Sequence, residues 1–376
     1  MYIQNFLNKI ADKDSTFFTG VPDSQLKPLC DYLMKTYGIS DKHIIASNEG
    51  NCTALAAGYY LATGKVPVVY MQNSGIGNMA NPSISLLNSE VYNIPCIFII
   101  GWRGEPGIKD EPQHIYQGKV TLDLLKVLGI EYMVIDKETT EEDIEKRMKV
   151  LGPLIDKGKS IAFVIRKGSI TYDEKVLYKN NNIMLREEVI RHIINKTEED
   201  IIVSTTGKAS RELFEIREQN GQSHKYDFLT VGSMGHSSSI ALGISLQKPS
   251  SKIWCIDGDG AILMHMGAMA LIGSNKPSNL IHIVINNNAH ETVGGMPTVA
   301  DKINLIQIAK GCGYPIAISV DNYLDLDKAL DEANSSKTLM FIEVKVSLGS
   351  REDLGRPTIT AIENKNNFMD YLKEKE

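Results

Sequence analysis

The sequence predicts an α/β protein of two domains, each built on a doubly wound parallel β-sheet with helices on both faces. Three observations carry this prediction. The chain has 376 residues, which is more than one ordinary hydrophobic core holds. Short apolar runs alternate with longer stretches of helical periodicity. This alternation stops once, near the middle of the chain, and then starts again.

The first half contains six runs rich in apolar and β-branched residues, each short enough to be a strand. Longer stretches such as 51–64 and 139–158 lie between them and have the apolar spacing of helices. Near-continuous apolar strands that alternate with helices form parallel sheets with both faces covered. We therefore expect a first domain over residues 1–168, with strands at 16–21, 43–48, 66–72, 95–102, 131–136 and 161–167.

Residues 169–184 interrupt this rhythm with charged residues and asparagines and show little apolar periodicity. Such a composition predicts a linker. The alternation then resumes, so a second α/β domain is expected over residues 185–376. Its strands are expected at 200–207, 227–233, 251–259, 280–287, 314–320 and 339–346.

Composition limits the classes of function. Apolar residues make up 43% and charged residues 23% of the chain, as in water-soluble globular proteins. A net charge of −6 gives no electrostatic footprint for nucleic acid or for an anionic membrane. No apolar run reaches the ~20 residues of a membrane span. The first residues lack a secretion signal, and the five cysteines form no CxxC pair, so we expect a cytoplasmic protein with reduced thiols.

Ligands of open parallel sheets bind beyond the carboxyl ends of the strands. Residues that closely follow the predicted strands are therefore the candidates for function. These positions are occupied by acidic, basic, amide, hydroxyl or small residues: Asp23, Glu49, Ser74, Arg103, Thr206, Gly232, Asp259 and Asn287.

Two of these strand ends together predict a metal–diphosphate site. Asp259 offers a carboxylate oxygen and Asn287 an amide oxygen, which suit Mg²⁺ or Ca²⁺ and not zinc. Gly258 and Gly260 would leave backbone N–H groups bare for a phosphate. A helix predicted to begin at Ala261 would point its amino end at the same anion.

The same residues also occur in other kinds of site and in plain turns. Glycine, aspartate and asparagine are also ordinary turn formers. An EF-hand fails because the twelfth position of its loop is Ala268, and a phosphate-binding loop ending at 209 fails because its hydroxyl position is Ala209. A phosphohydrolase of the haloacid dehalogenase kind, with Asp257 as nucleophile beside Asp259, stays open.

The spacing of GDG, then 25 residues, then NN resembles the signature of thiamine-diphosphate-dependent enzymes. The resemblance implies that thiamine diphosphate and Mg²⁺ are the cofactors, and that Asp259, Asn287 and the backbone carbonyl of Ala289 bind the metal. The glycine that usually follows NN is Asn288 in this chain. Asparagine also tolerates the left-handed backbone conformation, so the turn can still form.

Thiamine chemistry requires an acid that hydrogen-bonds the pyrimidine ring of the cofactor. Glu49, in the segment IIASNEGNCTALAAGYY, matches the family's residue for this task. Its neighbours are small or apolar, so burial is expected to raise the pKa of Glu49. A glutamate that only caps a helix is the alternative.

The segment TVGSMGHSSSIALG resembles the part of the family that supports a bent cofactor. Met234 would lie beneath the cofactor, and the carbonyl of Gly232 would accept a hydrogen bond from its amino group. A core methionine is the alternative for Met234. The remaining cofactor contacts implied by the resemblance are Ser74, Gly75, Thr206 and Gly207.

In this family the glutamate and the metal site come from different chains. The resemblance therefore implies a homodimer or a higher homo-oligomer with active sites at the subunit interface. Many relatives carry a third, central domain. This chain has room only for the linker there and resembles the short two-domain decarboxylases.

The substrate is implied by four segments that resemble the phosphonopyruvate decarboxylase branch of the family. That branch converts 3-phosphonopyruvate to phosphonoacetaldehyde and CO₂ in phosphonate biosynthesis. Sulfopyruvate decarboxylases share the two-domain layout and are the alternative. A non-catalytic cofactor-binding protein is a further alternative, but its expected mark, loss of Glu49, is absent. The four segments are FFTGVPDSQLKPL, GWRGEPGIKDEPQH, NNNAHETVGGMPTV and SREDLGRPTITAIENK.

Phosphonopyruvate carries about three negative charges at neutral pH, which a local cluster of basic residues must bind. The expected anion-binding residues, each with solvated surface charge as the alternative, are Arg103, Lys109, Arg351 and Arg356. The residues expected to face the reacting carbon and to protonate it after CO₂ has left are Asp23, His114 and His290.

Overall fold

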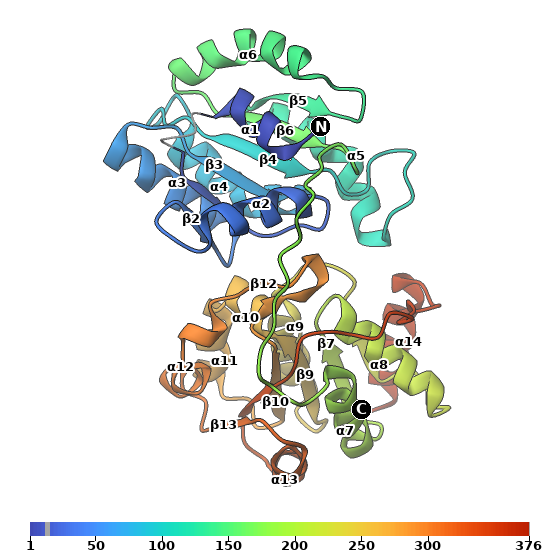
Figure 1. Cartoon of the computed structure of the whole chain (residues 1–376). Coiled ribbons are helices and arrows are strands. Elements are labelled where there is room, and N and C mark those ends of the chain that lie inside the picture. Colours follow the sequence, from blue (N-terminus) through green and yellow to red (C-terminus); the bar gives the residue numbers. More distant parts are fainter. Residues whose placement is uncertain (12–15, 376) are drawn as a thin grey trace. The chain divides into compact units, whose positions relative to one another are not determined.

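The computed structural model describes residues 1–11 and 16–375. They form two compact units, Met1–Leu177 and Tyr178–Glu376, each a sheet with helices on both sides (Figure 1). The boundary between the units falls within 169–184, the segment in which we expect a linker.

The first unit is a six-stranded sheet in the order β2-β1-β3-β4-β6-β5, in which every neighbouring pair is parallel. Helix α1 packs against α2 and α6, and α3 packs against α4. The strands are β1 (Phe18–Gly20), β2 (His43–Ile45), β3 (Val68–Gln72), β4 (Ile97–Gly101), β5 (Glu131–Ile135) and β6 (Ile161–Ile165). The helices are α1 (Ile3–Ile10), α2 (Lys27–Tyr37), α3 (Glu49–Thr63), α4 (Ile76–Pro82), α5 (Pro112–Val127) and α6 (Glu141–Asp156), with the short turns η1 (Asn73–Gly75) and η2 (Ser83–Leu87).

Local sequence explains where these helices begin and end. Helix α6 begins at a capping box, in which the Thr140 hydroxyl accepts from the Asp143 N–H and the Asp143 carboxylate accepts from the Thr140 N–H. The Asn48 side chain caps α3 by accepting from the Gly50 N–H at 2.7 Å. Gly64, with φ of 69°, ends the same helix. The cap therefore fixes the residue after Asn48 in the first turn of α3.

The second unit has the sheet order β13-β14-β10-β9-β7-β8, again with every pair parallel, and a separate two-stranded hairpin. Its strands are β7 (Ile201–Ser204), β8 (Asp227–Leu229), β9 (Ile253–Gly258), β10 (Leu280–Asn286), β13 (Ile316–Val320) and β14 (Met340–Lys345), with β11 (Ala289–His290) and β12 (Met296–Pro297) in the hairpin. Its helices are α7 (Arg186–Thr197), α8 (Lys208–Gln219), α9 (Ser237–Gln247), α10 (Asp259–Met264), α11 (Gly267–Asn275), α12 (Leu305–Cys312), α13 (Tyr323–Ser335) and α14 (Ala361–Glu374), with the turns η3 (Glu291–Val293) and η4 (Ala300–Lys302).

Two apolar clusters cover the two faces of the second sheet. Alternate residues of a strand point to opposite faces, so Trp254 and Ile256 belong to the cluster with α7, α8 and α13. Ile253 and Cys255 belong to the cluster with α9, α11, α12 and α14. Burial of each large apolar side chain contributes roughly 1.5–3 kcal/mol, so both faces hold the sheet and its strand ends in place.

The structure confirms the predicted fold class. Each of the twelve segments expected to be strands contains one strand of the two sheets. Helix α1 and the hairpin β11–β12 were not predicted. The helix expected from Ala261 begins earlier, at Asp259. Gly258, the last residue of β9, has an extended backbone and is the N-terminal cap of this helix.

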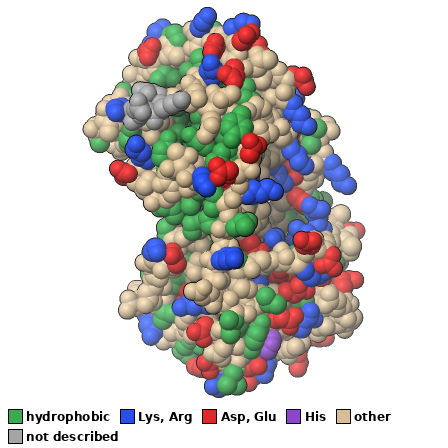
Figure 2. Space-filling model, in the orientation of Figure 1, with side chains coloured by type: hydrophobic (Ala, Val, Ile, Leu, Met, Phe, Trp, Pro, Cys, Tyr) green, Lys and Arg blue, Asp and Glu red, His purple; other side chains and the backbone are tan. Residues whose placement is uncertain are grey.

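The surface is mixed in charge. Basic and acidic side chains are interspersed on the visible face of each unit (Figure 2), in keeping with a net charge of −6. Within residues 1–11 and 16–375, none of the helices combines the length and the apolar character that a membrane span needs.

Candidate active site

Parallel strands bring the predicted residues to one edge of each sheet. In the first unit, the four predicted residues follow β1, β2, β3 and β4, and in the second unit they follow β7, β8, β9 and β10. The first group is Asp23, Glu49, Ser74 and Arg103, and the second is Thr206, Gly232, Asp259 and Asn287.

Glu49 is a buried acid in the first turn of α3. Its Oε2 accepts a hydrogen bond from the Asn78 side chain at 2.7 Å. Burial raises the pKa of Glu49 more than this bond lowers it. A Cβ on Gly75 would lie 2.5 Å from Oε1 of Glu49, so any larger residue there would require the Glu49 side chain to shift. The first turn of a helix normally favours an ionised acid, and burial works against that preference here.

Ser74 and Asp23 are linked through Gln72, the last residue of β3. The Ser74 hydroxyl donates to Oε1 of Gln72 at 2.8 Å, and the Gln72 amide donates to Oδ1 of Asp23 at 2.7 Å. Asp23 is fully buried, and burial raises its pKa although Gln72 and the charge of Arg103 lower it. Gln72 was not predicted as a site residue, although it lies at a strand end in the segment QNSGIGN.

Arg103 forms an ion pair within its own loop. Its Nε donates to Asp110 at 2.8 Å, Nη2 donates to the other oxygen of Asp110, and Nη1 donates to Ser24 at 3.1 Å. Lys109 is exposed in the same loop. His114 lies nearby in α5, where burial and the charge of Arg103 lower its pKa. The structure thus brings Arg103, Lys109 and His114 together around one loop. Three N–H groups of the Arg103 guanidinium, however, already donate hydrogen bonds to Asp110 and Ser24.

Asp259 is buried at the start of α10. Burial raises the pKa of Asp259 to about 7, although the Thr298 hydroxyl and the backbone N–H groups of Gly260 and Asn287 lower it. Thr298 donates to Oδ2 of Asp259 at 2.6 Å. The expectation of a bare N–H group is wrong for Gly258, whose N–H donates to Oδ1 of Asp257 at 2.9 Å. The short side chain of Asp257 reaches the N–H of the next residue.

Asn287 lies close to Asp259, because its backbone N–H is among the groups that lower the pKa of the Asp259 carboxylate. Its Oδ1 accepts from the Ala289 N–H at 3.0 Å, and its Nδ2 donates to Glu291 at 2.7 Å. Asn288 has φ of 60°, the left-handed conformation that the usual glycine would adopt. The asparagine therefore preserves the turn, and Ala289 begins the hairpin directly beyond it.

Met234 approaches the same edge from the loop after β8. A Cβ on Gly260 would lie 3.2 Å from Cε of Met234 and 3.3 Å from Nδ1 of His290, so both side chains flank this glycine. His290 is buried, which lowers its pKa to about 4. Met234 is only partly buried, so it is not a core methionine. Gly232 precedes it in the same loop.

Thr206 and Gly207 form the turn between β7 and α8. The Thr206 hydroxyl donates to the carbonyl of Val231 at 2.8 Å and joins this turn to the loop after β8. Gly207 has φ of 97°, which favours glycine. The turn leads directly into Lys208, the first residue of α8.

Arg351 and Arg356 lie in the segment between β14 and α14, near the C-terminal end of the second unit. The Arg351 guanidinium pairs with three carboxylates, from Glu187, Glu215 and Asp353. Its charge is therefore already offset, whereas Arg356 is exposed. None of these three carboxylates of Arg351 belongs to the Asp259–Asn287 edge.

A charged cluster beside Asn287 was missed by the sequence analysis. Glu291 accepts from Asn287 and also from Arg186 at 2.6 Å and from Lys208 at 3.0 Å. Arg186 in turn forms two 2.7 Å bonds to Glu212. Burial would raise the pKa of Glu291, but Arg186 and Lys208 hold it below its usual value. We call these five residues the Glu291 cluster.

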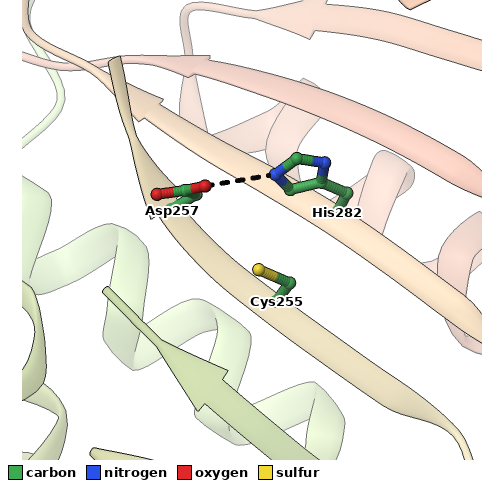
Figure 3. Close-up of side chains that lie close together, drawn as sticks. All are labelled: Cys255, Asp257 and His282. Atoms are coloured by element: carbon green, nitrogen blue, oxygen red, sulfur yellow. Dashed lines mark ion pairs between the residues drawn. The ribbon is translucent and has the colours of Figure 1, made fainter. Parts of the chain in front are cut away.

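Asp257 does not have the setting of a nucleophile. It is fully buried in β9 and its Oδ2 lies 3.5 Å from Nε2 of His282 in the adjacent β10, with Cys255 on the same face (Figure 3). Neither Oδ2 of Asp257 nor Nε2 of His282 has a hydrogen-bond partner in the described part of the chain. A phosphate in solvent cannot reach this carboxylate, which disfavours the phosphohydrolase interpretation.

The second edge has the donor set of a hard divalent cation. A carboxylate, an amide oxygen and a backbone carbonyl are contributed by Asp259, Asn287 and Ala289, as Mg²⁺ prefers. Burial disfavours the ionised form of Asp259 and raises its pKa, and a cation beside the carboxylate would offset this effect. We call these three groups the candidate metal site.

Comparison with protein families gives two matches. The N-terminal TPP-binding domain of thiamine pyrophosphate enzymes matches residues 4–127, and the C-terminal TPP-binding domain of the same enzymes matches residues 205–344. The strand-end residues of the first unit all lie in the first of these ranges, and those of the second unit all lie in the other.

Individual relatives extend the similarity to nearly the whole chain. A phosphonopyruvate decarboxylase of Streptomyces viridochromogenes is 31% identical over 379 residues, which cover 95% of this chain and 91% of the relative. One from Streptomyces hygroscopicus is 30% identical over 382 residues, or 96% and 91%. A sulfopyruvate decarboxylase of Methanosarcina acetivorans is 27% identical over 329 residues, or 81% of each chain. The chain therefore belongs to the thiamine-pyrophosphate-dependent decarboxylases, in the family that includes these phosphonopyruvate and sulfopyruvate enzymes.

Proposed function

We propose that this chain decarboxylates 3-phosphonopyruvate to phosphonoacetaldehyde and CO₂ in phosphonate biosynthesis, with thiamine diphosphate and Mg²⁺ as cofactors. The observation that carries the proposal is the similarity to two phosphonopyruvate decarboxylases over at least 95% of the chain. The placement of the predicted residues at the two sheet edges supports it, because the same edges are where such sheets bind ligands.

The second unit would bind the diphosphate end of the cofactor. The candidate metal site would hold the Mg²⁺ that binds the diphosphate, with Thr206 and Gly207 on the neighbouring turn. When bound, thiamine diphosphate supplies a nucleophilic carbon and an electron sink for the pair left by CO₂, which no side chain provides. Met234, beside Gly260, would support the middle of the cofactor, and the carbonyl of Gly232 would accept from its amino group.

The first unit would supply the acid that shares a proton with the pyrimidine ring of the cofactor. Glu49 would hold a proton at its carboxyl group and share it with a ring nitrogen, since its raised pKa keeps the protonated form accessible. Asn78 occupies Oε2 of Glu49, so Oε1, which passes close to Gly75, would face the cofactor. Ser74 would lie beside the same ring.

Three buried groups would supply or accept the proton at the reacting carbon. Burial raises the pKa of Asp23 and lowers the pKa values of His114 and His290. All three groups are therefore biased toward their neutral forms. A neutral acid can donate a proton to a carbon from which CO₂ has left, and a neutral imidazole can relay it.

Arg103 is the strongest candidate for binding the phosphonate. It lies at the end of β4, and its charge acts on the buried Asp23. Asp110 and Ser24 occupy three of its five N–H donors, which leaves two for an anion. Lys109, Arg351 and Arg356 remain the further candidates, with Arg351 weakened by its three carboxylate partners.

Sulfopyruvate is the second candidate substrate, favoured by the similarity to a sulfopyruvate decarboxylase over 81% of this chain. The two acids differ mainly in charge, because a dianionic phosphonate carries roughly one more negative charge than a sulfonate. A single arginine such as Arg103 can bind either group.

We also propose that the working unit is a homodimer or a higher homo-oligomer. Helix α3 has no charged residue after Glu49, and α9 and α11 have none at all. These helices nevertheless carry exposed leucines, namely Leu55, Leu61, Leu246 and Leu271. Uncharged helix faces of this kind are typical of contacts between subunits, and a second copy of the chain is the partner that the family resemblance implies.

A direct assay tests the function. The purified protein is offered phosphonopyruvate, sulfopyruvate and pyruvate in turn, with thiamine diphosphate and Mg²⁺, and released CO₂ is measured. We expect the highest kcat/KM for phosphonopyruvate and no release after chelation of the metal. Faster release from sulfopyruvate would transfer the assignment to that acid, and no release from any of the three would contradict decarboxylation.

A further inference from the structure

Glu291 joins the candidate metal site to two helices. It is the first residue of η3, and its side chain is about nine-tenths buried, with 9% exposed. One of its oxygens accepts from Asn287 and Arg186, and the other accepts from Lys208. Arg186 begins α7 and Lys208 begins α8. The carboxylate therefore ties the end of β10 to the starts of both helices.

The side chain of an asparagine can bind a cation only when its oxygen, and not its NH₂ group, faces the ion. The two neighbours of the Asn287 amide both select one orientation. Glu291, ion-paired on both oxygens, can only accept, so it requires the NH₂ group on its side. The Ala289 N–H can only donate, so it requires the oxygen on the other side.

Turning the amide over would break both hydrogen bonds. It would also place an oxygen against a carboxylate and an NH₂ group against an N–H. A charge-assisted bond such as the one to Glu291 is about twice as strong as a neutral one, so the carboxylate dominates this choice.

We propose that Glu291 is a positioning residue for the metal site: it fixes the Asn287 amide with its oxygen available to the cation. The proposal rests on the proposed function, because it takes Asn287 as a metal ligand. Groups that orient metal ligands from behind in this way typically change metal affinity by about ten- to hundredfold when they are replaced.

Arg186 and Lys208 keep the Glu291 carboxylate where Asn287 needs it. Arg186 is shared between Glu291 and Glu212, and Lys208 adds a second positive charge. Two carboxylates thus face two cations, so the buried cluster balances its charge and each group has a partner. Glu212 bonds Arg186 but not Asn287, which makes it the matched control.

The test measures binding of Mn²⁺, which prefers the same oxygen ligands as Mg²⁺, by electron paramagnetic resonance with thiamine diphosphate present. In E291Q, residue 291 can both donate and accept, so it no longer selects one orientation of Asn287. We expect its Kd for Mn²⁺ to rise by about ten- to hundredfold. In E212Q, which keeps Glu291 beside Asn287, we expect a change of less than about threefold. An equal loss in both variants would overturn the proposal.

A second pair of variants separates orientation from packing. An aspartate at 287 presents an oxygen to the cation whichever way it is turned, and the amide that E291Q introduces can donate to it. We therefore expect N287D/E291Q to bind Mn²⁺ at least as tightly as N287D. A tenfold loss in this background as well would mean that Glu291 acts only through packing and would overturn the proposal. This comparison decides the question even if E291Q alone does not fold.

D259A keeps the two proposals apart. If D259A loses Mn²⁺ binding while E291Q keeps it, the metal site stands and the role given to Glu291 is wrong. If D259A binds Mn²⁺ as tightly as the parent protein, the proposed metal site itself is wrong.

Discussion

The two units share one topology and differ in the chemistry at their strand ends. The first sheet runs β2-β1-β3-β4-β6-β5, and the second, read from its other edge, runs β8-β7-β9-β10-β14-β13, so their strands correspond one to one in chain order. After the third strand of each, the first unit has Ser74 and Gly75 and the second has Asp259 and Gly260. The shared scaffold thus fixes where a site can lie, while the loop residues decide what the site does.

The second position shows the contrast most clearly. After β2 the first unit has Glu49, a buried acid whose pKa is raised, and after β8 the second unit has Gly232 and Met234, which cannot ionise. After the third strand, it is the second unit that has an acid. This acid is Asp259, which follows β9 and lies close to Asn287. One edge is thus suited to hold a proton and the other to hold a cation.

The largest expected effect is at the cation edge. D259A removes the only side-chain carboxylate of the candidate metal site, so we expect binding of thiamine diphosphate with Mg²⁺ to fall below detection in calorimetry. D301A, which removes an acid from the turn η4 in the same unit, is the control and should bind normally. Unchanged affinity of D259A for thiamine diphosphate with Mg²⁺ would show that Asp259 does not bind the metal ion. The edge of the second unit would then no longer be the one that holds a cation.

Mixed oligomers test whether the two edges cooperate across chains. E49Q and D259A proteins should each be inactive alone, because each damages one edge. When the two are unfolded and refolded together, mixed oligomers contain sites in which both edges are intact, and activity should return. If mixed oligomers form without any activity, both edges of a site come from the same chain.

A smaller effect is expected at Arg103. Loss of an arginine that pairs with a phosphonate should cost on the order of 2 to 5 kcal/mol, or about thirty- to several-thousand-fold in kcat/KM. R103A should therefore weaken phosphonopyruvate far more than pyruvate, which lacks the group, while K109A on the same loop should change less. Equal losses for both acids would mean that Arg103 supports the loop through Asp110 or binds the shared carboxylate.

The smallest effect concerns the fit around Glu49. G75A would place a methyl group 2.5 Å from the Glu49 side chain, and such crowding costs about 1–3 kcal/mol. G77A is the control, because a Cβ there meets nothing within 4 Å. We expect a lower melting temperature in G75A than in G77A. Equal melting temperatures would show that Glu49 can move aside.

Much of the fold and the outline of the site could be predicted because both depend on local patterns. Apolar runs such as IFIIG, all of it buried in β4, identify strands, and the residues after them must lie at the sheet edge. Gly258 was misjudged because a short aspartate can bond the N–H of the next residue, which the spacing of a motif does not reveal.

The Glu291 cluster could not be predicted, because its members are far apart in the sequence. Arg186 and Lys208 each begin a helix and look like ordinary solvated charges. They come to Glu291 only because α7 packs against α8 and both helices share one apolar cluster with residues of β10. The ion pair between Arg103 and Asp110 is different. Its partners are seven residues apart in one loop, so their pairing was open to prediction from the sequence.

The contrast between the two edges is tested most directly by proton–deuterium exchange at the reactive carbon of bound thiamine diphosphate in the E49Q protein. This substitution keeps the size of the side chain but removes the carboxyl proton that Glu49 would share. We predict that E49Q binds the cofactor and Mg²⁺ with nearly the affinity of the parent protein and exchanges the proton of the reactive carbon at least about a hundredfold more slowly. Exchange at the parent rate, with the cofactor fully bound, would contradict the claim that the strand-end edge of the first unit holds the proton through Glu49.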